Sequence, residues 1–381
     1  MKLERAVISV LSAPVEAPVQ MSFSQLGARN MVIVELEADG LTGVGESWVN
    51  YPAWAMTERV ATLEHGVLPL LAELDVSDPP EVQRELLALL APVARQWGAP
   101  GPIWQALSAV DLALWDLLGQ SRGVPVAALL DGTDTADQVR VYASGVGPSD
   151  VEDLCAVATE AGITAVKARV GFYRERDEET LTRVRASVPP EVELFVDANQ
   201  AWSLQEAKEF CAWAEPYDVT WLEEPVAGNN LDDLCELSRT TGVRLACGEN
   251  LYGLEEFDRY ARSGAVGILQ PDPAKSGGFT VAGALARQLP DQVAASPHCY
   301  GGGIVAAASV HLAAAFSTKV PWVELDVHPN PLRDDLVRDR FRARNGRIAV
   351  PTEPGLGVEL DRDVMDRYLI DRRERDLRAL V

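Results

Sequence analysis

The chain has 381 residues, 47% of them hydrophobic and 24% charged, and its formal net charge is −23 with a sequence pI near 4.6. This composition is that of an ordinary globular protein, and the length allows one large domain or two. The negative charge argues against nucleic acid or an anionic membrane as a partner. No signal peptide or membrane-spanning run is recognised, and five cysteines without CxxC spacing indicate reduced thiols. We therefore expect a cytoplasmic protein.

The first third of the chain predicts an α+β domain, residues 1–130. It begins with a meander of three short strands and continues with three long helices. The strands are expected at residues 3–12, 31–37 and 42–46, and the helices at residues 54–72, 80–93 and 103–120. Residues 13–30 are rich in Pro, Ser and Gln and are interpreted as a loop.

From about residue 138 short β-prone runs alternate with helical patterns, with a period of about 25 residues that is typical of successive βα units. The runs are 139–144, 163–168, 192–197, 219–223, 243–249, 266–272, 292–297 and 320–324. Eight strands with seven intervening helices predict a barrel rather than a doubly wound sheet, because no Gly-rich phosphate turn follows the first strand. Residues 345–381 break the rhythm and are expected to pack back on the first domain, with Asp366 to Leu380 helical.

Ionisable side chains stand at the ends of seven consecutive predicted strands, where barrel enzymes carry their chemistry. Three of them are the carboxylates Asp197, Glu223 and Glu249, spaced 26 residues apart in each case. Hard oxygen ligands that converge on one point suit Mg²⁺. The other strand ends carry Lys167 and Arg169, Asp272 with Lys275 just beyond it, His298, and Glu324.

These groups point to removal of the α-proton of a carboxylate substrate. That proton is weakly acidic, so its loss requires a metal and cations that stabilise the enediolate. Lys or His is the base in sites of this kind; here His298 is placed as the base, and Asp272 orients it and raises its pKa. Taken alone, each of these residues is more simply explained as a turn residue, a helix cap or a solvated charge than as a functional group. Glu224 is interpreted in this way. Seven matched positions favour a functional interpretation.

The motifs VKAR, VDAN, EEP, GEN, QPDPAKSGG, SPH and WVE, in this order, and the helix Ala109 to Asp116 resemble the mandelate racemase branch of the enolase superfamily. The resemblance covers nearly the whole chain. It implies a modified TIM barrel, (β/α)₇β, over residues 131–344, capped by the α+β domain. It also implies a small-molecule carboxylate substrate and one Mg²⁺ per subunit, with Mn²⁺ as an alternative ion, and we expect a homo-oligomer. The residues it assigns are the metal ligands Asp197, Glu223 and Glu249, the dyad His298 and Asp272, the carboxylate-binding Glu324, and Lys167 as the first lysine of a KxK motif.

The chain departs from the family pattern at Arg169, which stands where the second lysine of KxK is expected. Arginine stays protonated, so it is a poor base and a better clamp for substrate oxygens. A two-base racemase needs a proton acceptor on each face, whereas a dehydratase can use His298 as its one base, with the same residue or another acid assisting departure of the β-hydroxide. We therefore interpret the protein as a lyase that dehydrates an aldonate or aldarate. Because Lys167 could be a second base, a racemase or epimerase of a 2-hydroxy acid or an amino-acid derivative stays open, as does a metal-binding hydrolase barrel or a catalytically silent relative.

Three further features concern the rim of the site. Lys275 stands near a position where muconate-cycloisomerase-like relatives carry a base, but with the His–Asp pair also present it is interpreted as a supporting cation. In this family, loops of the capping domain close the barrel mouth, and residues 13–30 and Trp48 to Trp54 are the matching stretches. Gly301 to Gly303 either lets the backbone approach the substrate or forms a turn.

Overall fold

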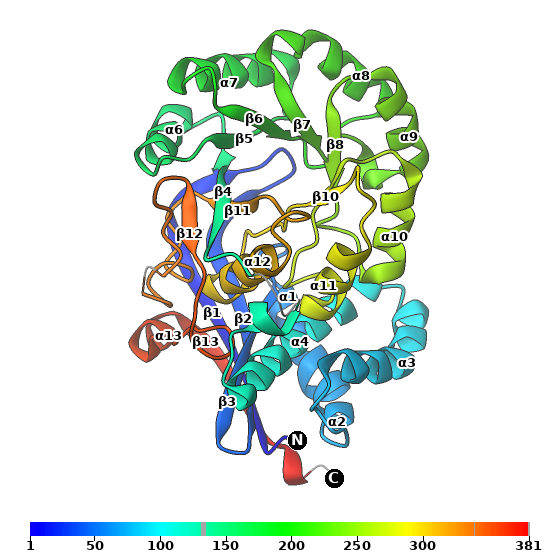
Figure 1. The fold of residues 1–381 in the computed structure, drawn as a ribbon, viewed down its shortest axis with the longest axis vertical. Helices are drawn as coiled ribbons and strands as arrows, with labels where there is room; N and C mark the ends of the chain where they lie inside the picture. The colour runs from blue at the N-terminus through cyan, green and yellow to red at the C-terminus, as the bar shows by residue number, and fades with distance from the viewer. Residues whose placement is uncertain (131–134, 339, 380–381) are drawn as a thin grey trace.

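The computed structural model describes residues 1–130, 135–338 and 340–379, which form two sheets (Figure 1). The first sheet is antiparallel and has the order β13-β1-β2-β3. Its strands are β1 (Arg5–Gln20), β2 (Gln25–Ala38), β3 (Leu41–Trp48) and β13 (Leu369–Asp376). The helices of this domain are α1 (Ala55–Ala61), a π-helical turn (Thr62–Val67), α2 (Leu68–Leu71), α3 (Pro79–Trp97), α4 (Pro100–Arg122) and α5 (Val126–Leu130). Of these, α1 and α4 pack against the strands, and α3 and α5 pack against α4.

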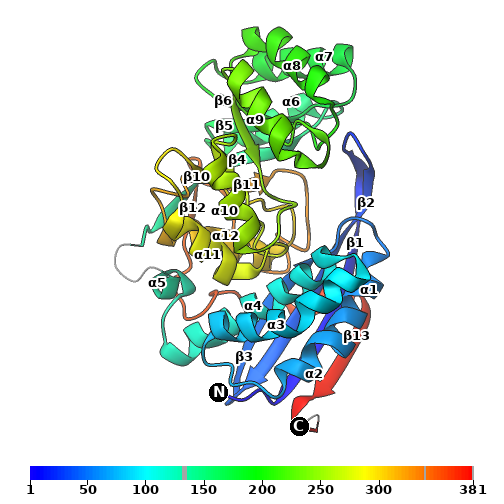
Figure 2. The same cartoon turned by 90° about the vertical axis from the view of Figure 1, so that its right-hand side faces the viewer.

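The segment 13–30, expected to be a loop, is a β-hairpin. β1 continues to Gln20 and pairs with β2 as far as Gln25, with a register shift between Pro14 and Val19. The prediction was wrong because proline and polar residues argue against a central strand, whereas a bulged two-stranded ribbon tolerates both. Figure 2 shows this ribbon extending past the capping helices and beside the barrel.

The second sheet contains eight parallel strands in the order β10-β9-β8-β7-β6-β5-β4-β11 among the described residues. They are β4 (Gln138–Val146), β5 (Ala165–Arg169), β6 (Glu193–Asp197), β7 (Val219–Glu223), β8 (Arg244–Cys247), β9 (Ile268–Leu269), β10 (Ala294–Ala295) and β11 (Val323–Asp326). Between β10 and β11 the backbone N–H of Ala295 donates to the carbonyl of Lys319 at 2.7 Å, and Ser296 Oγ donates to the carbonyl of Trp322 at 3.3 Å.

One helix separates each successive pair of these strands, and in Figure 1 helices α6 to α11 ring the outside. The helices are α6 (Val151–Glu160), α7 (Arg174–Ser187), α8 (Leu204–Trp213), α9 (Leu231–Thr240), α10 (Gly253–Ser263), α11 (Gly278–Gln288) and α12 (Gly303–Ala315). The predicted (β/α)₇β modified TIM barrel with an N-terminal α+β domain is therefore confirmed. Within the described ranges, no helix combines the length and the apolar character that a bilayer crossing requires.

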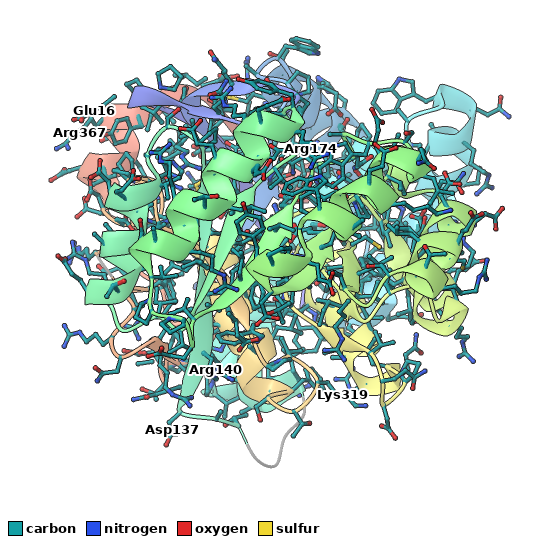
Figure 3. The ribbon with its side chains drawn as sticks, turned by 90° about the horizontal axis from the view of Figure 1, so that it is seen from above. Glu16, Asp137, Arg140, Arg174, Lys319 and Arg367 are labelled. Carbon is teal, nitrogen blue, oxygen red and sulfur yellow. The ribbon has the colours of Figure 1, made fainter. Side chains whose placement is uncertain are left out.

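A layer of large side chains fills the barrel below the strand ends. Phe195 and Trp221 stack with ring centroids 3.6 Å apart, and Tyr142 meets Trp221 edge-on at 5.4 Å. The guanidinium of Arg140 lies 3.8 Å from the ring centroid of Trp322, and Figure 3 shows Arg140 on the same side of the molecule as Lys319. Side chains alternate along a strand, so the next inward positions toward the carboxyl ends form the layer above this one. They are Ser144, Lys167, Asp197, Glu223 and Glu324.

The C-terminal segment divides between the two sheets. β12 (Arg347–Ala349) pairs antiparallel with β4 of the barrel, whereas β13 pairs with β1. The prediction of a helix over 366–380 was wrong for residues 369–376, which form the strand β13. The helix α13 (Arg362–Tyr368) ends just before this strand. The many charged side chains of β13 are typical of an exposed edge strand. Residues 131–134, where we predicted the domain boundary, and residues 380–381 lie outside the described part of the chain.

Buried polar side chains of the capping domain hold it against the rest of the chain. Asp116 on α4 accepts from the backbone N–H groups of Val44 and Leu356, at 2.9 and 2.8 Å. Asp111, five residues earlier on the same helix, accepts from the backbone N–H of Thr280 on α11 at 3.1 Å. Burial raises the pKa of Asp111 to about 7 and that of Asp116 to about 6, although these hydrogen bonds oppose the shift.

Stability is expected to depend on pH through His311 in α12. The ring is fully buried, its Nδ1 accepts from the N–H of Ala127, and its Nε2 donates to the carbonyl of Leu356. Burial lowers the pKa of His311 to about 4. Between pH 6.5 and 4 the unfolded chain therefore binds a proton that the folded chain does not, so stability falls as pH falls, by about 3 kcal/mol. His311→Asn should remove this contribution from urea unfolding curves measured across that range; an unchanged slope against pH would contradict the assignment.

Candidate active site

A cavity of about 600 Å³ opens at the carboxyl ends of the barrel strands and is roofed by the capping domain. The barrel lines it with most of the predicted residues: Lys167, Arg169, Asp197, Glu249, Lys275, His298 and Glu324. Glu223 and Asp272 are fully buried and contact lining residues from behind. The structure thus brings together all eight residues that the sequence singled out as catalytic or metal-binding.

Lys167 lies at the centre of one side of the cavity. Its Nζ donates to both carboxylate oxygens of Glu223 at 2.9 Å and lies 2.8 Å from Glu324 Oε1. Gln270 Nε2 holds Glu223 from below at 2.6 Å, and Ser144 Oγ donates to Glu324 at 2.5 Å. The two carboxylates and the ammonium group therefore form a fully buried ion cluster.

Asp197 stands level with Glu223, because the parallel register of β6 and β7 pairs these two residues. The backbone N–H and the side-chain amide of Asn199 each donate to it at 2.8 Å. Burial raises the pKa of Asp197 and of Glu223; Lys167 opposes the shift in both, and neighbouring carboxylates add to it. Burial is the largest cause of both shifts, as expected for carboxylates that are removed from solvent at this edge of the cavity.

His298 is held by carboxylates on both ring nitrogens. Nδ1 lies 2.7 Å from Asp272 Oδ2, and Nε2 lies 3.0 Å from Glu249 Oε2. Burial alone would lower the pKa of His298, but Glu249, Glu324 and Asp272 raise it well above its ordinary value. Asp272 is itself fixed by the N–H of Ala274 at 2.7 Å. The dyad is thus oriented with Nε2 toward the cavity.

The three predicted metal ligands have the chemistry that a divalent cation prefers. They are hard carboxylates at the ends of consecutive strands; Asp197 and Glu249 line the cavity, and Glu223 stands level with Asp197 in the register of the two strands. Within the described residues, no three His, Cys, Asp or Glu side chains stand close enough to hold an ion as they are. Lys167 neutralises Glu223 and His298 pairs with Glu249 instead. Ion binding therefore requires Glu249 to turn away from His298.

Arg169 and Lys275 both make contacts within the cavity wall. Arg169 Nη2 donates to Tyr300 Oη at 2.8 Å, and its Nη1 donates to the carbonyl of Gln20 in the hairpin at 3.0 Å. Lys275 Nζ donates to Asn250 Oδ1 at 2.9 Å and lies 4.3 Å from the ring centroid of Trp48. Lys275 also lies 3.8 Å from Glu249, and these contacts agree with a supporting cation.

Glu224 is not the capping residue that we expected. It lines the cavity, and its side chain accepts from the amides of Gln200 at 2.9 Å, Asn229 at 2.6 Å and Asn250 at 2.9 Å. Burial and the nearby charge of Glu249 raise the pKa of Glu224 to about 7. Sequence reasoning missed this role because strand alternation excludes Glu224 from the inward face. The sequence did contain a signal for this role. Side-chain amides follow two of the predicted metal ligands: Asn199 and Gln200 come after Asp197, and Asn250 comes after Glu249.

The glycines after His298 let a side chain of the capping domain, rather than the substrate, approach the backbone closely. A Cβ on Gly301 would lie 2.4 Å from Glu46 Oε1, and the N–H of Gly302 donates to that oxygen at 2.6 Å. Glu46 also accepts from the N–H of Val305 at 2.9 Å, at the start of α12. This close approach fixes the loop that carries Tyr300, a lining residue that the sequence prediction did not include.

Both predicted rim segments reach the cavity. Met21 and Phe23 come from the tip of the hairpin, and Trp48 and Tyr51 come from the end of β3 and the loop after it. Phe23 meets Tyr51 edge-on, with ring centroids 5.4 Å apart. Trp54 does not line the cavity and is 77% exposed.

Family models of known proteins match both the N-terminal domain and the barrel. The family model described as "Mandelate racemase / muconate lactonizing enzyme, N-terminal domain" matches residues 5–131, and the one described as "Enolase C-terminal domain-like" matches residues 150–364. The arabinonate dehydratase of Saccharolobus solfataricus is 31% identical over 89% of this chain and 90% of its own length. The D-galactarolactone cycloisomerase of Agrobacterium fabrum is 29% identical over 97% of this chain and 99% of its own length.

Solved structures agree with this placement. A mandelate racemase/muconate lactonizing enzyme from Bordetella bronchiseptica superposes with a TM-score of 0.88 at 33% identity, over 97% of this chain and 99% of that one. A variant of L-talarate/galactarate dehydratase, liganded with Mg and L-glucarate, superposes with a TM-score of 0.84 at 25% identity, over 98% of this chain and 93% of that one. The relatives are lyases and isomerases that share enolase-superfamily chemistry. The chain is an enzyme of the enolase superfamily and belongs to its mandelate racemase/muconate lactonizing enzyme family.

Proposed function

We propose that the protein is a Mg²⁺-dependent lyase that dehydrates an aldonic or aldaric acid to a 2-keto-3-deoxy acid through an enediolate. One observation carries the choice of dehydration. The oriented base His298 faces the carboxylate cluster, whereas the strand end of β5 presents Arg169, which donates to Tyr300 and to the hairpin backbone. Arginine cannot accept a proton at neutral pH, so the site has one well-placed base rather than two.

Asp197, Glu223 and Glu249 are the proposed ligands of the metal. Mg²⁺ supplies electrostatic stabilisation of the charge that develops on the substrate carboxylate when the α-proton leaves. The liganded talarate/galactarate dehydratase structure supports this choice of ion for a related enzyme. One ion per subunit is expected, with Mn²⁺ as an alternative.

The remaining side chains bind the substrate and move its protons. His298 Nε2 pairs with Glu249 in the structure and becomes free when Glu249 binds the ion instead. Nε2 then takes the α-proton, and Asp272 holds the ring on the opposite nitrogen and stabilises the imidazolium that forms. Lys167 places a positive charge beside the substrate carboxylate. Burial would raise the pKa of Glu324, but Lys167 and His298 lower it. Glu324 therefore takes up a proton from solvent when it donates a hydrogen bond to that carboxylate.

An isomerase is the second candidate, because Lys167 is another nitrogen in the same cavity and one full-length relative is a cycloisomerase. The ion cluster argues against Lys167 as an acceptor. A lysine that donates to two buried carboxylates holds its proton. When Glu223 binds the metal, Glu324 stays beside Lys167 and still favours its charged form.

A screen of acid sugars in D₂O with Mg²⁺ tests the proposal. We expect one or more aldonates or aldarates to yield a 2-keto acid, detected as its semicarbazone, with deuterium at the carbon that lost its hydroxyl. Deuterium in recovered substrate of inverted configuration, without keto acid, would establish the isomerase instead. Light scattering on the same preparation checks the expected homo-oligomer.

A further inference from the structure

Tyr300 is a buried phenol inside the cavity, two residues after His298. It is 6% exposed, and its ring centroid lies 6.5 Å from that of His298. The carbonyl of Tyr300 accepts from Asn50 Nδ2 at 3.0 Å, so the capping domain holds the loop in place. One substrate molecule in this cavity can therefore contact both rings.

Two guanidinium groups surround this phenol. Arg169 Nη2 donates to Tyr300 Oη at 2.8 Å, and the guanidinium carbon of Arg29 lies 4.6 Å from the ring centroid. Arg29 is paired with Asp326 at 2.5 Å, whereas Arg169 donates to two neutral oxygens, those of Tyr300 and Gln20. The positive charge of Arg169 is therefore available to any negative charge that forms on Tyr300 Oη.

The proposed dehydration requires a second proton transfer that His298 does not by itself explain. Hydroxide is a poor leaving group, so the β-oxygen needs a proton as its bond to carbon breaks. Lys167 is held in the ion cluster by Glu223 and Glu324, beside the proposed metal ligands. Tyr300 has an O–H group in the same cavity, and the guanidinium of Arg169 donates to its oxygen.

We propose that Tyr300 is the general acid of this reaction; the proposal rests on the dehydration proposed above. His298 removes the α-proton, the C–O bond at the β-carbon breaks, and Tyr300 Oη donates its proton to the departing oxygen, so that water leaves. The phenolate that remains is stabilised by Arg169. The enol product then ketonises, gaining a proton at the former β-carbon and losing one from its hydroxyl. The proton held by His298 returns to Tyr300 through solvent, so no net proton is consumed.

Tyr300→Phe tests the role, because it keeps the ring beside Arg29 and the backbone bond to Asn50 and removes only the hydroxyl. With the acid sugar that the wild type dehydrates, we expect kcat to fall by about 10²- to 10³-fold. With the analogue that carries fluoride in place of the β-hydroxyl, the leaving group needs no proton. Fluoride release by the variant should therefore stay within a few-fold of the wild type.

The matched control is Tyr217→Phe, which removes a phenolic hydroxyl at the surface, where it contacts Thr182. This variant should keep wild-type rates with both substrates. If Tyr300→Phe loses fluoride and hydroxide elimination equally, or loses neither, the general-acid role is overturned while the dehydration stands. A wild type that forms keto acid from no acid sugar and releases no fluoride overturns the dehydration, and this proposal with it.

Discussion

Glu223→Gln is expected to abolish Mg²⁺ binding and turnover together. Glu223 is 0% exposed, and its carboxylate is already in contact with Lys167 and Gln270, so the substitution removes a ligand charge without room for water to replace it. Titration calorimetry should show no Mg²⁺ binding, and Mg²⁺ should no longer raise the melting temperature as it does when an ion binds only the folded wild type.

The neighbouring Glu224→Gln is a matched control, since it makes the same chemical change one residue along the chain. Glu224 accepts hydrogen bonds from three side-chain amides, and its oxygens do not contact Lys167. This variant should keep the Mg²⁺-dependent rise in melting temperature, although the cavity wall is altered. Retention of Mg²⁺ binding by Glu223→Gln, or its loss only in Glu224→Gln, would show that the inward ligand had been assigned to the wrong glutamate.

The barrel and the residues at its strand ends were predictable because they depend on short-range rules. Each strand is a short apolar run, and side chains alternate along it, which predicts that Glu223 faces the barrel interior; Glu224 lies just past the end of the strand, where the alternation no longer applies, and it lines the cavity as well. Parallel strands bring their carboxyl ends to one edge, which is why Asp197, Lys167 and His298 meet although they are far apart in the chain.

The residues that escaped prediction depend on long-range contacts. The hairpin that contains Pro14 becomes a strand pair through its partner in β2 and through Arg169, which donates to the carbonyl of Gln20. The charged residues of β13 form a strand because β1 offers an edge. Tyr300 is a surface-like loop residue in the sequence, and its loop is buried by contacts with Arg169, Glu46 and Asn50. Such pairings leave no periodic pattern in the chain itself.

His298→Asn is expected to lower turnover by about 10³-fold while the fold and the metal site persist. The Asn amide can take the place of Nδ1 and donate to Asp272, but it has no nitrogen that accepts a proton at the position of Nε2. Glu249 also loses its partner at 3.0 Å and becomes free to bind the ion. Solvent deuterium should therefore not enter the α-position of recovered substrate, and Mg²⁺ should still raise the melting temperature.

His311→Asn provides the matched control for this variant, because it removes a buried histidine on α12 that does not line the cavity. It should lower the free energy of unfolding at neutral pH by about 1–2 kcal/mol, through loss of a buried hydrogen bond, and leave kcat near the wild-type value. Full turnover by His298→Asn would exclude His298 as the base. That result would favour the metal-binding hydrolase alternative, since the site would then activate water rather than a carbon acid.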